Sequence, residues 1–253
     1  MKSIFRSAVI ALTFSAITNV AQAQNNIVSA KKVYKLSKLN EHSIVKDSSG
    51  NRCNYTAWNN MLASGRYGLK VAESANDKPS LIIVKLSKTE REDALAKLPK
   101  PAESPFFKTG ELLKRFKVQD VNSQIFDSKE LVGKVVVLNF WHLNHLPSMM
   151  DINNLNELAD VYKDDPNVVF LAIPADNPDE VKEFLAHTTF KYHIIDKGKS
   201  IISKYNIETY PTSVVVDRNG KVQYHSSGYT PNTSYWITKT IEQCKRYNEN
   251  AAL

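Results

Sequence analysis

The chain has 253 residues, of which 42% are hydrophobic, enough to fill one core of ordinary domain size and a smaller module. The formal net charge of +7 is mild for this length, and the lysines are scattered rather than interleaved with aromatic residues on one short stretch. The composition therefore disfavours nucleic-acid binding and predicts an ordinary solvated surface.

The N-terminus carries the three parts of a secretory signal peptide. A basic segment, residues 1–6, precedes an apolar run over 7–20 that is too short for a membrane span, and Ala21-Gln22-Ala23 has the small-x-small pattern of a cleavage site. A buried N-terminal helix is the alternative. We expect residues 1–23 to be removed, no transmembrane segment, and a soluble protein in an oxidising compartment, most simply the periplasm.

Residues 24–105 predict a small α+β accessory module followed by a linker. Alternating residues predict short strands over 33–36 and 43–45, and an apolar run predicts another over 81–84. A helix is expected over 56–63, ending at Ser64-Gly65, and a second opens with the capping box Ser87-x-x-Glu90. The three prolines of residues 99–105 predict an extended spacer.

Residues 106–253 form the second predicted domain, built around residues 133–162. The apolar, β-branched run 135–140 predicts a central strand that is buried on both faces. Apolar residues then recur at helical spacing, which predicts a helix packed on the sheet. Its stripe is Met149, Ile152, Leu155, Leu158 and Tyr162. The loop 141–148 therefore lies where α/β folds place ligands.

The remaining pattern completes an α/β domain with a mixed sheet flanked by helices. It starts with a β-hairpin over 116–127, and it ends with an antiparallel pair and an amphipathic helix that carries Cys244. Between them we expect strands at 168–173, 194–195, 213–216 and 221–224, and helices at 178–188 and 200–205.

The segment GKVVVLNFW, followed by a proline in the first helical turn, resembles the TlpA/ResA family of extracytoplasmic thiol-disulfide oxidoreductases. This family belongs to the AhpC/TSA-redoxin superfamily, and the resemblance is to exported proteins of the Bacteroidetes type. It runs from about Phe116 to the C-terminus and includes Thr209-Tyr210-Pro211-Thr212, which looks like the family's cis-proline loop. The resemblance implies a thioredoxin-like fold with an N-terminal β-hairpin.

The family's paired cysteines fall on His145 and Ser148 of this chain. A dithiol works because one cysteine at a helix N-terminus forms a stable thiolate and a second cysteine resolves the mixed disulfide. An imidazole and a serine hydroxyl can do neither. We therefore expect no dithiol exchange at this locus, no catalytic residue of that kind and no cofactor, and whether the chain is an enzyme stays open.

The same loop allows other readings. His142 and His145 could face one metal ion, although two histidines are half a site and a helix N-terminus repels a cation. A Ser148–His145 nucleophilic pair is less favoured, because no third orienting group is evident. The favoured hypothesis is a peptide-binding groove for an extended peptide or a partner protein, against a pure scaffold. Its expected residues are Trp141, His142, His145, Pro147, Tyr210 and Pro211.

The chain has two cysteines, Cys53 in the accessory module and Cys244 in the last helix. They could form a disulfide between the domains, or they could be unrelated apolar thiols. A redox-active pair is a third possibility. It gives the alternative function, a thiol-disulfide oxidoreductase that uses Cys53 and Cys244.

Overall fold

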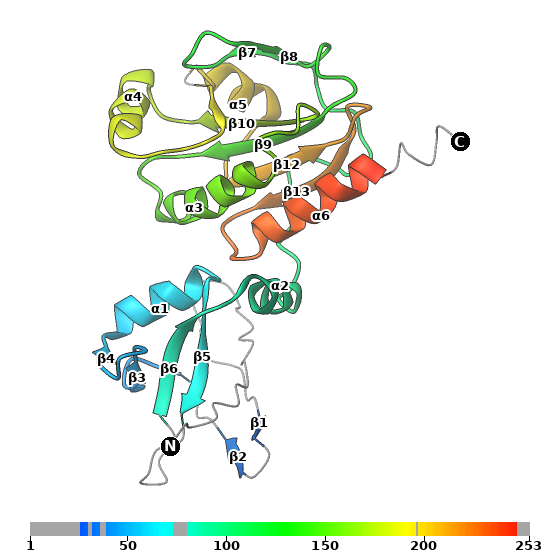
Figure 1. The fold of residues 1–253 in the computed structure, drawn as a ribbon. Coiled ribbons are helices and arrows are strands. Elements are labelled where there is room, and N and C mark those ends of the chain that lie inside the picture. Colours follow the sequence, from blue (N-terminus) through cyan, green and yellow to red (C-terminus); the bar gives the residue numbers. More distant parts are fainter. Residues whose placement is uncertain (1–25, 30–31, 36–38, 73–79, 196, 247–253) are drawn as a thin grey trace. The chain divides into compact units, whose positions relative to one another are not determined.

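A computed structural model describes residues 26–29, 32–35, 39–72, 80–195 and 197–246. The chain divides into two compact units, Met1–Pro99 and Lys100–Leu253, which we describe separately (Figure 1). The predicted signal peptide lies outside the described residues. Within the described ranges, no helix combines the length and the hydropathy that crossing a bilayer requires.

The first unit contains a four-stranded sheet in the order β4-β3-β6-β5, in which β3 and β6 are parallel and the other pairs are antiparallel. A separate antiparallel pair consists of β1 (Asn26–Ser29) and β2 (Lys32–Lys35). The sheet strands are β3 (Val45–Lys46), β4 (Arg52–Cys53), β5 (Tyr67–Ala72) and β6 (Ser80–Lys85). Two helices accompany them, α1 (Tyr55–Ala63) and α2 (Lys88–Ala96).

Both helices of the first unit begin at a side-chain cap. Asn54 Oδ1 accepts the Ala57 N–H at the start of α1. At α2, Ser87 and Glu90 form the predicted capping box. Trp58 and Leu62 of α1 are buried. The helix ends at Ala63 and Gly65 adopts a φ of 68°, so the predicted end at Ser64-Gly65 is confirmed.

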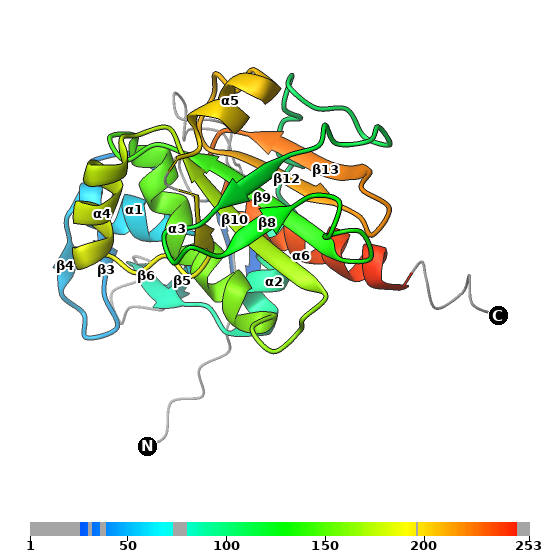
Figure 2. The ribbon, with the colours of Figure 1, turned by 90° about the horizontal axis from the view of Figure 1, so that it is seen from above.

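The second unit has a five-stranded mixed sheet in the order β11-β10-β9-β12-β13, and Figure 2 shows β10, β9, β12 and β13 side by side. β9, β10 and β11 are parallel, whereas β12 runs antiparallel to both of its neighbours. The strands are β9 (Val135–Trp141), β10 (Val168–Pro174), β11 (His193–Ile194), β12 (Thr212–Val216) and β13 (Val222–Ser227). This mixed α/β architecture confirms the predicted fold class.

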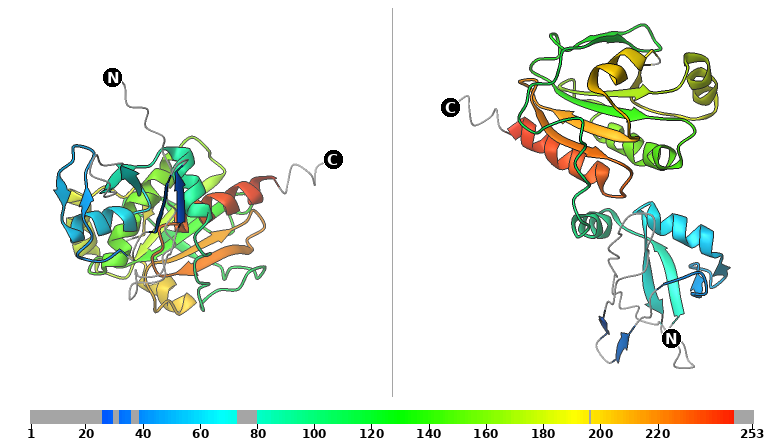
Figure 3. Two further views of the ribbon diagram at one scale, coloured as in Figure 1. Left: turned by 90° about the horizontal axis from the view of Figure 1, so that it is seen from below. Right: turned by 180° about the vertical axis from the view of Figure 1, so that it is seen from behind.

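The alternating side chains of β9 supply two cores, one on each face of the sheet. Val135, Val137 and Trp141 face α3 and α6, which lie together on one face (Figures 1 and 3). Val136, Leu138 and Phe140 face α5 and the β7–β8 hairpin. The elements are α3 (Leu146–Val161), α4 (Pro178–His187), α5 (Lys199–Tyr205), α6 (Thr233–Arg246), β7 (Lys117–Gln119) and β8 (Ile125–Asp127).

Part of the segment predicted as a spacer is packed on the second unit. The Ser227 N–H donates to Ala102 O over 3.1 Å, and the Ser104 N–H donates to His225 Nδ1 over 3.1 Å. These bonds lie along β13, the last strand of the sheet, so residues 102–104 cover that edge. Composition predicted an extended segment but not its packing, because its partners His225 and Ser227 lie far along the chain.

Candidate functional site at the carboxyl ends of the central strands

The site lies where β9 and β10 end side by side. Trp141, the last residue of β9, pairs with Pro174, and the Ala175 N–H donates to Trp141 O over 2.9 Å. The chain then turns into α3, with His145 as its N-cap residue and Pro147 in the first turn. Because Pro147 lacks an N–H group, it is tolerated where helix donors have no intrahelical partner.

His142 connects this loop to the loop after β10. Its Nδ1 lies 3.1 Å from Asp176 Oδ1, and the Leu143 N–H donates to Asp176 Oδ2 over 2.8 Å. The Asn144 N–H also lies 3.1 Å from His142 Nδ1, which cannot both donate and accept. Since Asp176 is buried and Asn144 is exposed, we assign the Nδ1 proton to the bond with Asp176.

The loop before β12 lies against the same histidine. The Tyr210–Pro211 peptide bond is cis, as the predicted cis-proline loop requires. The rings of His142 and Tyr210 meet edge to face, with their centroids 6.0 Å apart. Partial burial, and then the nearby charge of Asp176, raise the pKa of Tyr210. His142 therefore contacts the loops that follow β10 and precede β12.

Three residues predicted to form the groove surface or to replace the thiols are buried. Trp141 is 1% exposed because it packs against Phe184 and Phe190 in the core. Pro211 and Ser148 are also buried. The expectation that Trp141 and Pro211 line a groove that a peptide can reach is therefore wrong: period-two alternation directs the Trp141 side chain to the α3 face of the sheet.

The accessible part of the site is smaller and includes a residue that the sequence did not single out. Leu146, the first residue of α3, is 71% exposed. His142, His145, Pro147 and Tyr210 are half-buried. We call these five residues the α3 entry surface.

The predicted serine–histidine pair is present, but without access to solvent. His145 Nδ1 lies 3.4 Å from Ser148 Oγ, and the His142 N–H donates to the same oxygen over 3.4 Å. Ser148 is 1% exposed, so no substrate carbonyl could reach its hydroxyl as the structure stands. Across the residues that the structure describes, no three His, Cys, Asp or Glu side chains are grouped to hold a metal ion.

A buried carboxyl lies directly behind this loop. Asp151, in the second turn of α3, is 1% exposed, and neither of its oxygens has a hydrogen-bond partner among the described residues. Burial raises its pKa to about 7. The pKa of Tyr192 is raised by burial and, to a lesser degree, by the charge of Asp151. The core beside the site therefore contains a group that can exchange a proton near neutral pH.

Sequence reasoning missed Asp176, Asp151 and Leu146. Asp176 follows the end of a parallel strand by two residues, a position that α/β folds use for ligands and that could have marked it. Asp151 is three residues after Ser148 and four before Leu155, so helical spacing alone places it on the buried face. No sequence pattern indicated the exposure of Leu146.

The two cysteines are free thiols in different units. The pKa of Cys244 is raised to about 11, mainly by burial, so its thiolate is scarce at neutral pH. Their pairing stays a prediction.

Comparison with known proteins identifies the second unit. The sequence pattern of the AhpC/TSA family matches residues 109–225. Thiol-disulfide oxidoreductase ResA of Bacillus thuringiensis (strain Al Hakam) is 35% identical over 123 residues, 48% of this chain and 70% of that protein. The ResA of Halalkalibacterium halodurans is 30% identical over 132 residues, 51% of this chain and 74% of that protein.

A solved structure supports the same fold. The solution structure of a candidate protein disulfide isomerase from Bacteroides thetaiotaomicron matches with a TM-score of 0.51 at 19% identity, and it covers 58% of this chain and 98% of that one. The chain therefore belongs to the family of the thiol-disulfide oxidoreductase ResA, and its second unit contains an AhpC/TSA family domain with a thioredoxin-like fold.

Proposed function

We propose that the second unit binds an extended segment of a partner protein at the α3 entry surface and performs no dithiol exchange. The observation that carries this proposal is the coincidence of two facts at one place. Loop 141–148 contains no cysteine, and the same loop presents Leu146, 71% exposed, and His142, whose ring meets that of Tyr210 edge to face.

The surface has the chemistry of a small protein-binding site. Aromatic and apolar side chains at the centre of a contact contribute most of the binding free energy, and a polar rim orients the partner. Tyr210 and Leu146 supply the apolar area, while the two imidazoles supply hydrogen-bonding groups. The buried Asp176 carboxylate fixes His142, so less side-chain entropy is lost on binding than for a free surface histidine.

The residues of the loop support the absence of dithiol exchange there. At the positions of the resembled dithiol, His145 cannot form a disulfide and Ser148 cannot resolve one. The alternative, an oxidoreductase that uses Cys53 and Cys244, has less support because the Cys244 thiol is 7% exposed and its pKa is raised. The name of the ResA relatives describes those proteins, and their activity does not transfer to a loop without cysteine.

Turnover of insulin disulfides with dithiothreitol as reductant tests the chemical half of the proposal. We expect the wild-type chain to leave the rate at its uncatalysed value. Catalysis that persists in the Cys53→Ser, Cys244→Ser double variant would contradict the proposal, since no thiol would remain. Catalysis that disappears in the double variant would instead support the alternative oxidoreductase.

We further propose that the protein acts outside the cytoplasm, in the periplasm. The basic start, the short apolar run and the Ala21-Gln22-Ala23 site support export. Sequencing the N-terminus of protein recovered from a periplasmic extract should give Gln24 as the first residue. An intact N-terminus in a cytoplasmic fraction would contradict export.

A further inference from the structure

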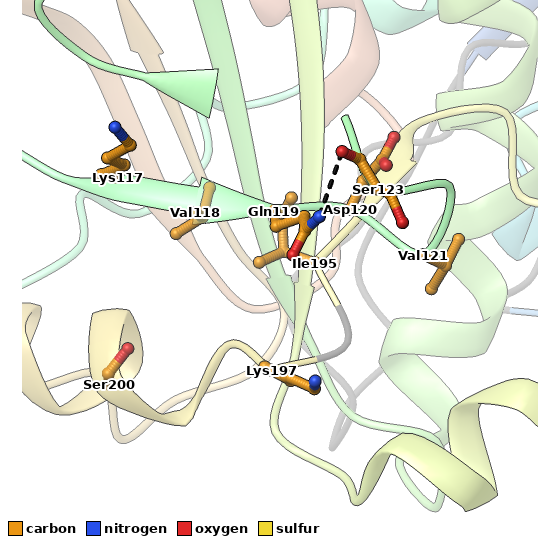
Figure 4. Close-up of a pocket in the computed structure, with 9 residues that line it drawn as sticks. All are labelled: Lys117, Val118, Gln119, Asp120, Val121, Ser123, Ile195, Lys197 and Ser200. Atoms are coloured by element: carbon orange, nitrogen blue, oxygen red, sulfur yellow. Dashed lines mark hydrogen bonds between the residues drawn. The ribbon is translucent and has the colours of Figure 1, made fainter. Parts of the chain in front are cut away.

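A pocket separate from the α3 entry surface lies between the β7–β8 hairpin and the start of α5 (Figure 4). Its volume is about 340 Å³, within the range that small-molecule sites occupy. Val118, Gln119 and Ser123 line it from the hairpin side, and Ile195 and Ser200 line it from the other side. It shares no residue with the α3 entry surface.

The pocket is held open by contacts at the turn of the hairpin. The Val121 N–H donates to Ile194 O over 2.9 Å, which attaches the hairpin to the edge strand β11. Asp120 Oδ2 lies 3.0 Å from His193 Nδ1, and the rings of Phe126 and His193 pack with centroids 4.7 Å apart. The hairpin is therefore fixed at its turn without any ligand.

The pocket is lined by apolar side chains and by two lysines. Ile195, 1% exposed, and Val118 provide the apolar part. Lys117 and Lys197 lie on opposite sides of the pocket, as Figure 4 shows, and the Ser200 hydroxyl adds a hydrogen-bonding group. Lys117 Nζ is 3.9 Å from Asp127 Oδ2, and a surface pair of this length contributes little, so its amine can turn to a ligand.

Asp120 also lines the pocket, but its carboxylate oxygens are engaged within the hairpin and by His193. Its side chain is 1% exposed. Oδ1 accepts the N–H groups of Asn122 and Gln124 over 2.9 and 2.8 Å, and Oδ2 is engaged by His193. The carboxylate oxygens of Asp120 are thus bonded to protein groups, whereas Lys117 and Lys197 are exposed.

We propose that this pocket binds a small organic anion, with its acidic head drawn to Lys197 and the Ser200 hydroxyl. The apolar stem of the ligand packs on Val118 and Ile195. A carboxylate on a short aliphatic chain meets both requirements, whether it is a free acid or the side chain of an acidic residue. Neither an uncharged chain nor a bare inorganic anion meets both.

Titrations of the isotope-labelled full chain at physiological salt test the proposal through the amide signals of Val118, Gln119 and Ser200. Pentanoate is the probe, 1-pentanol has the stem without the charge, and inorganic phosphate has charge without the stem. We expect saturable shifts with pentanoate and at least fivefold weaker binding of the other two. The binding of N-acetylglutamate amide and of a glutamate-containing tripeptide is then compared with that of pentanoate. This comparison shows whether the pocket prefers a free acid or an acidic side chain.

Two lysine variants provide the matched control. Lys197→Gln should weaken pentanoate binding at least fivefold. Lys199→Gln, two residues away, should leave it unchanged, because Lys199 Nζ donates to Asn177 Oδ1 over 2.7 Å and does not line the pocket. Equal binding by the two variants, no saturable shift at these amides, or equal binding of phosphate and pentanoate would each overturn the proposal.

Discussion

His142 Nδ1 lies 3.1 Å from Oδ1 of the buried Asp176, which joins the loop after β9 to the loop after β10. Asp176 also accepts the Leu143 N–H, so one carboxylate satisfies a side chain and a backbone group of the same loop. The position of His142 in the α3 entry surface therefore depends on a residue that no partner would touch.

Replacing Asp176 with alanine should lower the free energy of unfolding by about 2 kcal/mol, because two donors lose their buried acceptor. Urea denaturation measures this change. Glu183→Gln, an exposed charge on α4, is the matched control and should stay within about 0.5 kcal/mol of wild type. Equal stability of the two variants would show that the Asp176 contacts contribute nothing.

Asp151→Asn should change how stability depends on pH. The pKa of Asp151 is raised to about 7 from 3.8, so the folded state holds a proton that the unfolded state releases between these values. Wild-type stability is therefore lost as pH rises from about 4 to about 7, by about 4 kcal/mol from this group. Denaturation at pH 5 and pH 8 measures the free energy of unfolding, and its value for the variant should rise relative to wild type between pH 5 and pH 8. Asp164→Asn, at an exposed site, should show no such rise.

His225→Asn should act in the opposite direction. Burial lowers the pKa of His225, whose Nδ1 accepts the Ser104 N–H. The contribution of His225 to the free energy of unfolding is fully present above its pKa in the unfolded chain, about 6.5. It is lost as pH falls through its lower pKa in the folded state. Between pH 7 and pH 5 the variant should lose less stability than wild type. Exposed His187→Asn serves as the control, and parallel curves for wild type and His225→Asn would contradict the assignment.

The sequence predicted most of the second unit because hydrophobic period and burial agree there. The run 135–140 became β9, buried along its whole length, and the stripe from Met149 to Tyr162 became α3. The cis bond at Pro211 was also confirmed. By contrast, β5 of the first unit was not predicted, because Gly68 has a low strand propensity and the strand depends on pairing with β6.

The site could be located from the sequence, but its exposed residues could not. The strand and helix periods placed loop 141–148 at the carboxyl end of the central strand. This was sufficient to identify His142 and His145. Whether a side chain at the edge turns inward, as Trp141 does, or outward, as Leu146 does, depends on what packs beside it. Phe184 and Phe190, which cover Trp141, lie 43 and 49 residues further along the chain.

Introducing cysteines at the two lost positions should create a reactive dithiol. In a Cys53→Ser, Cys244→Ser background, His145→Cys with Ser148→Cys places the first thiol at the N-cap of α3, where the helix dipole favours a thiolate. The rate of alkylation against pH should give a thiol pKa below the ordinary value of about 8.5. Glu183→Cys with Ala186→Cys, late in α4, is the control pair. Equal thiol pKa values in the two variants would show that the loop no longer activates a cysteine.

Affinity for an unfolded chain measures binding at the α3 entry surface most directly. Fluorescently labelled, carboxymethylated insulin A chain is a probe without free thiols, so any binding is independent of disulfide exchange. Leu146→Ser should weaken its binding at least tenfold, about 1.4 kcal/mol. Val161→Ser, at the far end of the same helix and 68% exposed, should leave it unchanged. Equal affinity of the two variants, or no binding by wild type, would contradict protein binding at the α3 entry surface.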